Sequence, residues 1–324
     1  MLRTFLSFAF VLTVSITGRA DTGAEYLDFT KYQPQGINLT EHYFKLLQNT
    51  PQVAADLKNV KVVLIEGIMA NYVEVVGKVI KKITGEYEYY DDQMRWLKAS
   101  GIEFERIRLD TEESSLKNSK VIAANLAKQT KPILLLTHSK GGVDALMALV
   151  NNPALTKKLV GMIAMQSPYL GTPVADYLST TKPWNWVADV CLAVMGGSGE
   201  SLRDLTIKRR LAWYQENQKM IQAIQAAIPI LSFGSHKNDD PEKQDSMFEF
   251  SRNIMLQKMG VQSDGLVPWK SAVLPGGHYV AVEGLDHATT VSGNKFIKFD
   301  RLRFTNALFA LFLQVRAAHL AAGG

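Results

Sequence analysis

The sequence has a single cysteine, Cys191, among its 324 residues, so no disulfide can form within the chain. Cys191 lies in an apolar stretch, which favours a small buried side chain over a reactive thiol. The metal-binding spacings CxxC and HExxH and the EF-hand loop do not occur, so no motif indicates a metal site. Internal repeats and low-complexity tracts are missing too.

The chain also lacks a strong excess of charge of one sign. Lys and Arg total 36 and Asp and Glu total 31, for a net charge of +5. This charge is too small and too dispersed to indicate nucleic-acid binding, and we expect no nucleic-acid partner. Apolar residues make up 47% of the chain, enough for a large core, and the length suits one domain with an insertion.

The apolar run at the N-terminus, residues 5–16, is too short to span a bilayer comfortably. Arg3 precedes it, and the small residues Gly18 and Ala20 follow at the positions expected before a signal-peptidase cut. This pattern predicts that residues 1–20 are a signal peptide and that the mature protein is periplasmic or secreted. An uncleaved N-terminal anchor helix is the alternative.

Apolar runs of strand length alternate with helical patterns through the rest of the chain. We expect strands at residues 61–66, 102–109, 132–137, 160–166, 229–234 and 279–283, and helices at residues 41–48, 71–82, 116–128, 142–150 and 303–320, the last of them amphipathic. Strands that are apolar on both faces and alternate with helices indicate a mostly parallel sheet covered by helices on both sides. The sequence therefore predicts a single α/β domain at residues 21–324.

One connection, at about residues 171–227, is far longer than a usual strand–helix connection. It contains an apolar segment with Trp184 and Trp186, followed by a polar helix from about residue 202 to residue 226. The apolar segment suits either a hydrophobic lid or acyl-chain wall, which could also touch a lipid surface transiently, or a cap helix packed into the core. We leave both interpretations open.

The strongest motif is residues 136–142 (LTHSKGG), where an apolar strand gives way to a helix. A serine on such a strained strand-to-helix turn is typical of a nucleophile elbow, although Thr137 stands where Gly is usual. Ser139 is the candidate nucleophile, and the backbone N–H of Lys140 would face the developing oxyanion. An ordinary turn serine is the alternative interpretation.

Together with three further segments, this motif resembles the bacterial lipases of the α/β-hydrolase superfamily. The other segments are the loop after Glu66, residues 167–176 (SPYLGTPVAD) and residues 264–268 (DGLVP). The resemblance implies an α/β-hydrolase fold with a helical cap or lid, and the chain order serine, acid, histidine. It also implies a second oxyanion donor, the backbone N–H of Ile68 or alternatively of Met69.

Three histidines follow the elbow and the candidate acids. Catalytic groups in parallel sheets lie beyond the carboxyl ends of strands. His287 directly follows the expected strand 279–283 and is our candidate general base, whereas His278 precedes that strand and His319 lies in the closing helix. His138 stands beside Ser139, but the direction of the strand argues against it as the base.

The acid should follow the expected strand 229–234. By resemblance to the acid loop of bacterial lipases we select Asp264, which would accept a hydrogen bond from His287. A simple Asp-Gly turn is the alternative for Asp264. Asp239, Asp240 and Asp245 also follow the strand, the first two within a solvated loop, and Asp286 is the second choice as acid.

These residues predict an exported serine hydrolase that cleaves carboxylic esters, with lipid acyl esters favoured by the apolar insertion, and that needs no cofactor. Acyl transfer by the same residues, or lipid binding without catalysis, are the alternatives. In lipases that bind calcium, an acidic ligand stands two positions after the catalytic histidine. Thr289 occupies that position here, so we do not carry a calcium site over. The oligomeric state stays open.

Overall fold

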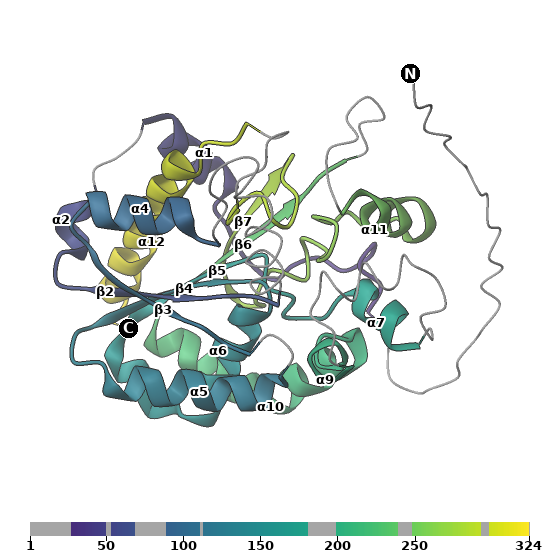
Figure 1. Cartoon of the computed structure of the whole chain (residues 1–324), viewed down its shortest axis with the longest axis horizontal. Coiled ribbons are helices and arrows are strands. Elements are labelled where there is room, and N and C mark those ends of the chain that lie inside the picture. Colours follow the sequence, from purple (N-terminus) through teal and green to yellow (C-terminus); the bar gives the residue numbers. More distant parts are fainter. Residues whose placement is uncertain are drawn as a thin grey trace, which may run out of the picture.

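A computed structural model describes the chain over residues 27–49, 53–68, 89–110, 113–180, 199–238, 248–292 and 298–323 (Figure 1). Several predicted features lie outside these residues: the signal peptide, the helix at 71–82, Met69, the tryptophans of the insertion, Cys191, and the acids Asp239, Asp240 and Asp245. Among the described residues, no helix is both long and apolar enough to cross a lipid bilayer.

Seven strands form one sheet in the order β1-β7-β6-β5-β4-β2-β3, and every pairing between them is parallel. The strands are β1 (Gly36–Asn38), β2 (Lys61–Ile65), β3 (Glu103–Ile107), β4 (Ile133–His138), β5 (Leu159–Met165), β6 (Ile230–His236) and β7 (Gly277–Glu283). The six predicted strands are thus confirmed to within two residues at each end. Strand β1 was not predicted, because its three residues are all exposed and present no apolar run.

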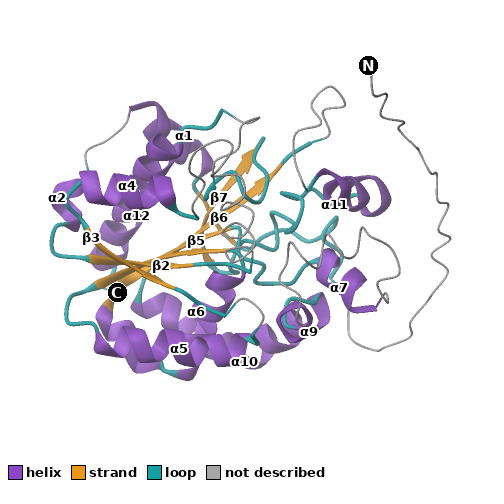
Figure 2. Cartoon of the chain, viewed as in Figure 1, coloured by secondary structure: helices purple, strands orange, loops and turns teal. Residues whose placement is uncertain are grey.

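Helices cover both faces of this sheet (Figure 2). The helices on one face are α1 (Thr40–Asn49), α4 (Asp91–Ala99) and α12 (Arg301–Ala321), and those on the other are α5 (Ser115–Lys128), α6 (Lys140–Asn151) and α10 (Ile207–Ala227). The short helix α2 (Ala54–Leu57) precedes β2, and a 3-10 turn at Pro153–Lys158 leads from α6 into β5. Because both faces are covered, all six residues of β4 are buried, as a parallel sheet requires.

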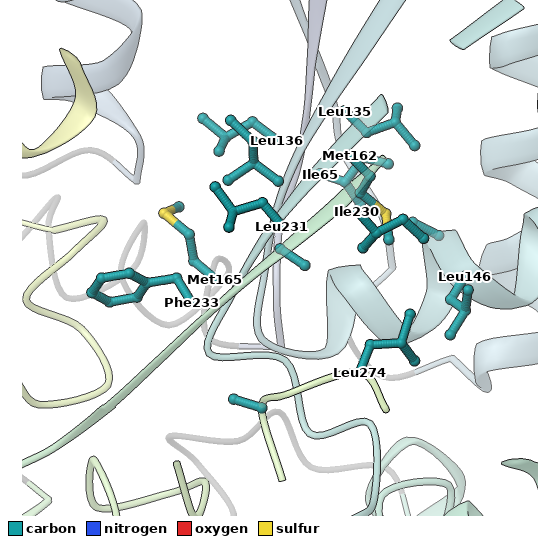
Figure 3. Close-up of a cluster of buried hydrophobic side chains, with 14 of the residues drawn as sticks. Ile65, Leu135, Leu136, Leu146, Met162, Met165, Ile230, Leu231, Phe233 and Leu274 are labelled. Carbon is teal, nitrogen blue, oxygen red and sulfur yellow. The ribbon is translucent and has the colours of Figure 1, made fainter. Parts of the chain in front are cut away.

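The core lies where the central strands meet these helices. Figure 3 shows part of it, and the residues labelled there are Ile65, Leu135, Leu136, Leu146, Met162, Met165, Ile230, Leu231, Phe233 and Leu274. Each is almost fully buried. Burial of one such side chain contributes about 1.5–3 kcal/mol, so the central strands are held firmly in place and give a rigid base for the loops that follow them.

The closing helix differs from the expected amphipathic pattern. In α12 the run of residues 304–312 is buried on all sides, because the helix lies between the sheet and helices α1 and α4. Only the second half alternates between buried and exposed positions. The prediction of an amphipathic helix at residues 303–320 is therefore wrong for its first half.

The long connection also differs from its prediction. The expected helix at 202–226 is two helices, α9 (Gly199–Arg203) and α10, and α10 packs against α6 on a face of the sheet. Helix α10 therefore does not belong to the part of the connection that could cover the strand ends. Figure 1 shows α7 (Pro173–Thr180), α9 and α11 (Glu249–Asn253), which runs into a π-helical turn at Ile254–Lys258, on the side where β6 and β7 end.

Candidate active site

Ser139 lies on a strained turn between β4 and α6. Its backbone angles, φ 56° and ψ −135°, fall in a region that side-chain-bearing residues rarely adopt, at a cost of about 1–3 kcal/mol. The turn is held because the Ser139 N–H donates to the Met165 carbonyl at 2.9 Å and the Ser139 carbonyl accepts from Gly142 N–H at 3.1 Å. The backbone itself thus raises the Ser139 side chain at the carboxyl end of β4.

Two glycines make room for this turn. A Cβ atom on Gly141 would lie 2.4 Å from the Glu66 carbonyl oxygen, and one on Gly67 would lie 2.5 Å from the Ser139 Cβ. Real Cβ atoms do not approach so closely, so the elbow and the loop after β2 fit together only with glycine at both positions. Thr137, where Gly is usual, is fully buried, and its hydroxyl faces the Ile163 carbonyl.

The structure brings the three predicted residues Ser139, His287 and Asp264 together. His287 Nε2 lies 2.9 Å from Ser139 Oγ, and His287 Nδ1 lies 2.8 Å from Asp264 Oδ2. His287 comes from the loop after β7 and Asp264 from the segment between β6 and β7. The exposed fractions are 7% for Ser139, 0% for His287 and 1% for Asp264, so only the serine has contact with solvent.

Asp264 is held in one orientation by its own loop. Its Oδ1 accepts the backbone N–H groups of Leu266 at 3.0 Å and Val267 at 2.7 Å. The main chain adds a second link, because His287 N–H donates to the Asp264 carbonyl at 2.9 Å. With Oδ1 occupied in this way, Oδ2 is left to face the imidazole ring.

Asp286, the second choice as acid, has a different place. Its Oδ1 accepts the backbone N–H groups of Ala288 and Thr289 at 3.0 and 2.8 Å, and the Thr289 hydroxyl at 2.7 Å. The carboxylate therefore shapes the turn that carries His287 and makes no contact with its ring. The Thr289 hydroxyl is thus engaged in this turn. Among the described residues, no group of three or more metal-ligating side chains occurs.

The other histidines lie in two different places. His278 lies inside β7, near its amino end, and His319 lies half-buried on α12. Burial, and then the neighbouring His319, lower the pKa of His278. His138 instead lies against the catalytic candidate, with its ring centroid 4.8 Å from that of His287, and its Nε2 donates to the His287 carbonyl at 2.9 Å. Burial, and then the neighbouring His287, hold the pKa of His138 well below its usual range, so His138 is neutral.

Gln166 is a site residue that the sequence did not single out. It directly follows β5 with a positive φ of 52° and is fully buried. Its Nε2 lies 3.0 Å from Asp264 Oδ2, 3.0 Å from the Asp286 carbonyl and 2.7 Å from Ser235 Oγ. Gln166 is a polar residue directly after a buried strand, at the same edge of the sheet as Ser139. This position is the sequence signal from which it could have been predicted as a site residue.

The other side of Gln166 faces the histidines. Its Oε1 accepts the Thr290 hydroxyl at 2.6 Å and lies 3.1 Å from His138 Nε2. Gln166 therefore joins the acid, the loop of the base and His138 in a single network with both ends of its amide group satisfied. A buried amide with all its hydrogen-bond partners is costly to disturb, because each polar group left unpaired lowers the stability of the fold by about 1–3 kcal/mol.

Tyr89 is a second residue that the sequence did not single out. It is buried, and its hydroxyl accepts from the Gly67 N–H at 3.2 Å and also contacts His138 Nδ1. Burial raises the pKa of Tyr89 far above its ordinary value, so the phenol keeps its proton. No motif points to Tyr89, since its role depends on a contact with a residue 49 positions away.

The two described oxyanion candidates flank the serine. The Lys140 N–H is the first amide of α6 and has no carbonyl partner one turn earlier. The Lys140 ammonium is buried and lies 3.0 and 2.8 Å from the carboxylate oxygens of Asp144, which also accepts from Asn118 at 2.9 Å. Its charge is thereby neutralised. Ile68 follows Gly67, on which a Cβ atom would lie 2.5 Å from the Ser139 Cβ, while Met69 lies outside the described residues.

Comparison with solved structures places this arrangement among known proteins. A metagenomic carboxyl esterase aligns with 82% of this chain and 76% of its own, at 21% identity and a TM-score of 0.58. The mature lipase of Bacillus licheniformis aligns with 79% of this chain and 91% of its own, at 18% identity and a TM-score of 0.59.

A third similar structure, lipase 1 from Pelosinus fermentans, aligns with 78% of this chain and 98% of its own, at 11% identity and a TM-score of 0.53. No protein-family model and no curated protein matches the sequence. The parallel sheet, the helices on both its faces and these likenesses show that the chain has the α/β-hydrolase fold found in bacterial esterases and lipases.

Proposed function

We propose that this protein is a serine hydrolase that cleaves carboxylic esters. The observation that carries the proposal is the hydrogen-bonded line from Ser139 Oγ through His287 to Asp264, at 2.9 and 2.8 Å, on a strained turn at the carboxyl end of β4. A serine next to a base that is itself oriented by a third group is the arrangement that activates a hydroxyl as a nucleophile.

The reaction would have two halves. Ser139 Oγ attacks the ester carbonyl carbon while His287 Nε2 takes its proton, and the resulting oxyanion accepts hydrogen bonds from the backbone N–H groups of Lys140 and Ile68. The tetrahedral intermediate collapses, and the alcohol leaves with the proton from His287. Water then attacks the acyl-enzyme by the same route and releases the carboxylic acid and Ser139. Asp264 holds the ring and stabilises the imidazolium in both halves.

Similar structures support ester chemistry in general, since those named above are a carboxyl esterase and two lipases. We further propose lipid acyl esters as substrates, on the ground of the apolar insertion, with Trp184 and Trp186 lining the path of the acyl chain. Export, and transient contact of the insertion with a lipid surface, are proposals that rest on the sequence alone.

The proposal is tested by reaction of the mature protein, residues 21–324, with a fluorophosphonate probe, followed by mapping of the adduct. We expect one adduct, on Ser139, which is lost in Ser139→Ala and strongly slowed in His287→Ala. Ser119→Ala is the matched control, because Ser119 is also buried but donates to a carbonyl within α5. An unlabelled wild type, or labelling that survives Ser139→Ala, would refute the proposal.

The acyl preference is tested separately with a series of p-nitrophenyl esters of increasing chain length. A lipid-directed site should give kcat/KM values that rise with chain length beyond butyrate, since each buried methylene contributes about 0.8 kcal/mol. The variants Trp184→Ala and Trp186→Ala should lower this rise and leave acetate hydrolysis nearly unchanged. A flat series would remove the lipid part of the proposal and keep the esterase part.

A further inference from the structure

A line of hydrogen bonds connects the loop after β2 with the loop after β7, behind Ser139. It starts at the Gly67 N–H, passes through the Tyr89 hydroxyl to His138 Nδ1, and continues from His138 Nε2 to the His287 carbonyl. Tyr89 and His138 are each 1% exposed, so water does not compete for these contacts. The two loops belong to strands that are separated by β6, β5 and β4 in the sheet.

The direction of every donor in this line is fixed by chemistry. The His287 carbonyl can only accept, so His138 Nε2 carries a hydrogen and donates to it. A neutral imidazole then has Nδ1 as its acceptor, and the Tyr89 O–H donates to Nδ1. The Tyr89 oxygen in turn accepts the Gly67 N–H at 3.2 Å. The line is therefore satisfied at each step in a single tautomer of His138.

Both ends of the line belong to the reacting centre of the proposed function. At one end, Gly67 lies so close to Ser139 that a Cβ atom on it would be 2.5 Å from the Ser139 Cβ, and it leads directly to the Ile68 amide, the second oxyanion donor. At the other end, the carbonyl is that of His287 itself. Small errors in the distance between base, nucleophile and oxyanion donors are expensive in catalysis, because the groups must match the transition state.

We propose that Tyr89 and His138 are positioning residues that fix the oxyanion loop and the catalytic histidine in one geometry. The inference rests on the proposed function. Gln166 extends the line to the acid, because its Oε1 is a second acceptor for His138 Nε2 while its Nε2 donates to Asp264. Oxyanion donor, base and acid are thus tied to one another by side chains that do not touch the substrate.

The first test breaks the line of hydrogen bonds at one atom, the hydroxyl oxygen of Tyr89. Tyr89→Phe deletes the hydroxyl and keeps the ring, which packs edge-on against His138 at 5.6 Å. We expect kcat to fall about 10- to 100-fold with KM changed less than about threefold, because ground-state binding does not use these contacts. Tyr90→Phe is the matched control: Tyr90 is equally buried and loses one hydroxyl contact, to the Ile65 carbonyl at 3.1 Å.

The second test separates the two halves of His138. In His138→Asn the amide oxygen stands near Nδ1 and can accept from Tyr89, but the donor to His287 is lost. In His138→Gln the longer amide can donate to the His287 carbonyl, as Nε2 does. We expect kcat to fall about 10- to 100-fold in the Asn variant and to recover at least about fivefold in the Gln variant. Equal kcat in the two variants would overturn the inference.

A double-variant cycle distinguishes a connected line from two independent contacts. In a connected line, Tyr89→Phe combined with His138→Asn lowers kcat no further than the worse single variant. If the two effects multiply, the inference is overturned. It is also overturned if the loss of kcat is proportional to the loss of melting temperature across the variants and Tyr90→Phe follows the same proportionality. Where His138→Asn yields too little folded protein, the comparison of Tyr89→Phe with Tyr90→Phe decides alone.

Fluorophosphonate labelling separates this inference from the proposed function. Wild-type protein that does not label at Ser139 refutes both. Wild-type protein that labels at Ser139, together with variants of Tyr89 and His138 that keep wild-type kcat, refutes the positioning role and leaves the esterase proposal intact. We expect labelling of Ser139 in every variant, with a rate constant that falls in parallel with kcat.

Discussion

The molecule holds two pairs of histidines, one at each end of the sheet. At the carboxyl end, His138 and His287 are buried, and each of their ring nitrogens contacts a defined partner. Toward the amino end, His278 and His319 are half-buried, and within the described part of the chain the buried His319 Nε2 has no hydrogen-bond partner. The residue type is the same, and the two pairs differ in whether every ring nitrogen has a hydrogen-bond partner.

The difference shows why burial alone does not mark an active site. Burial lowers the pKa of both His138 and His278, but only the pair at the carboxyl end is held in single tautomers by hydrogen-bond partners at the ring nitrogens. A fixed tautomer is what a general base requires, because its lone pair must face the nucleophile. Four expected outcomes test this comparison.

The largest expected effect separates the two pairs by activity. His287→Ala should lower kcat by about four to six orders of magnitude, because the serine then lacks a base. His278→Ala should leave kcat within about twofold. Steady-state hydrolysis of p-nitrophenyl butyrate measures both. Comparable losses in the two variants would contradict the assignment of the carboxyl-end pair.

The next effect concerns what orients the base. Asp264→Asn should lower kcat by about four orders of magnitude, since an amide donor at this position favours the wrong tautomer of His287. Asp286→Asn, the control from the adjoining turn, should lose stability through its turn contacts and keep kcat within about tenfold. Kinetics and thermal unfolding of both variants test this prediction. A larger loss of kcat in Asp286→Asn than in Asp264→Asn would mean that Asp286, and not Asp264, orients the base.

A smaller effect lies in the pH dependence of stability. The folded-state pKa of His138 is far below that of an unfolded chain, about 6.5, so the unfolded state binds a proton that the folded state does not. Stability therefore falls as the pH drops below 6.5 toward the folded pKa, by at most about 1.4 kcal/mol per pH unit for this group. The slope from this group fades as the pH rises past the unfolded pKa and is nearly absent above about pH 7.5.

Substitution assigns that slope to a residue. His138→Gln should remove more of the slope between pH 7 and pH 5 than His278→Gln, since burial of His278 is partial and its pKa is lowered less. Urea unfolding at several pH values measures the slope, and the comparison uses slopes because the substitution also changes absolute stability. An unchanged slope in His138→Gln would show that His138 is not held neutral by the fold.

The smallest effect concerns the unsatisfied ring of the amino-end pair. His319→Leu replaces a buried nitrogen without a partner by apolar atoms of similar size, so the free energy of unfolding should rise by about 0–1 kcal/mol. That corresponds to a melting temperature at most about 2–4 °C higher in a domain of this size. The same substitution at His138 should be destabilising. A large loss of stability in His319→Leu would mean that the ring has a structural function.

The sequence alone was sufficient for the parts of this comparison that depend on local order. An apolar strand, a serine and a helix in succession predict the elbow. The place of His287 after an expected strand and the resemblance of the Asp264 loop to the acid loop of bacterial lipases selected two further residues, which the structure brings together with Ser139. The strands were predictable because a buried parallel strand is apolar along its whole length. Strand β1 was not, since its three residues are exposed and its pairing with β7 is formed by the backbone.

The supporting residues were beyond the reach of sequence reasoning for a different reason. The contacts of Gln166 join residues up to 124 positions apart, and those of His138 up to 149. No periodicity records such distances. The direction of β4 argued against His138 as the base, but the contacts of His138 depend on where the loop after β7 returns over the sheet. Tertiary contacts of this kind are visible only once the strands are in place.

The backbone of Ser139 has a consequence for the evolution of this chain. Its left-handed φ is a standing penalty on folding that a glycine at the same position would relieve, and that glycine would also remove the hydroxyl. Selection for heat resistance thus favours glycine at this position, whereas selection for turnover favours serine. Any lineage that keeps the serine retains a fold slightly less stable than its own sequence would otherwise permit.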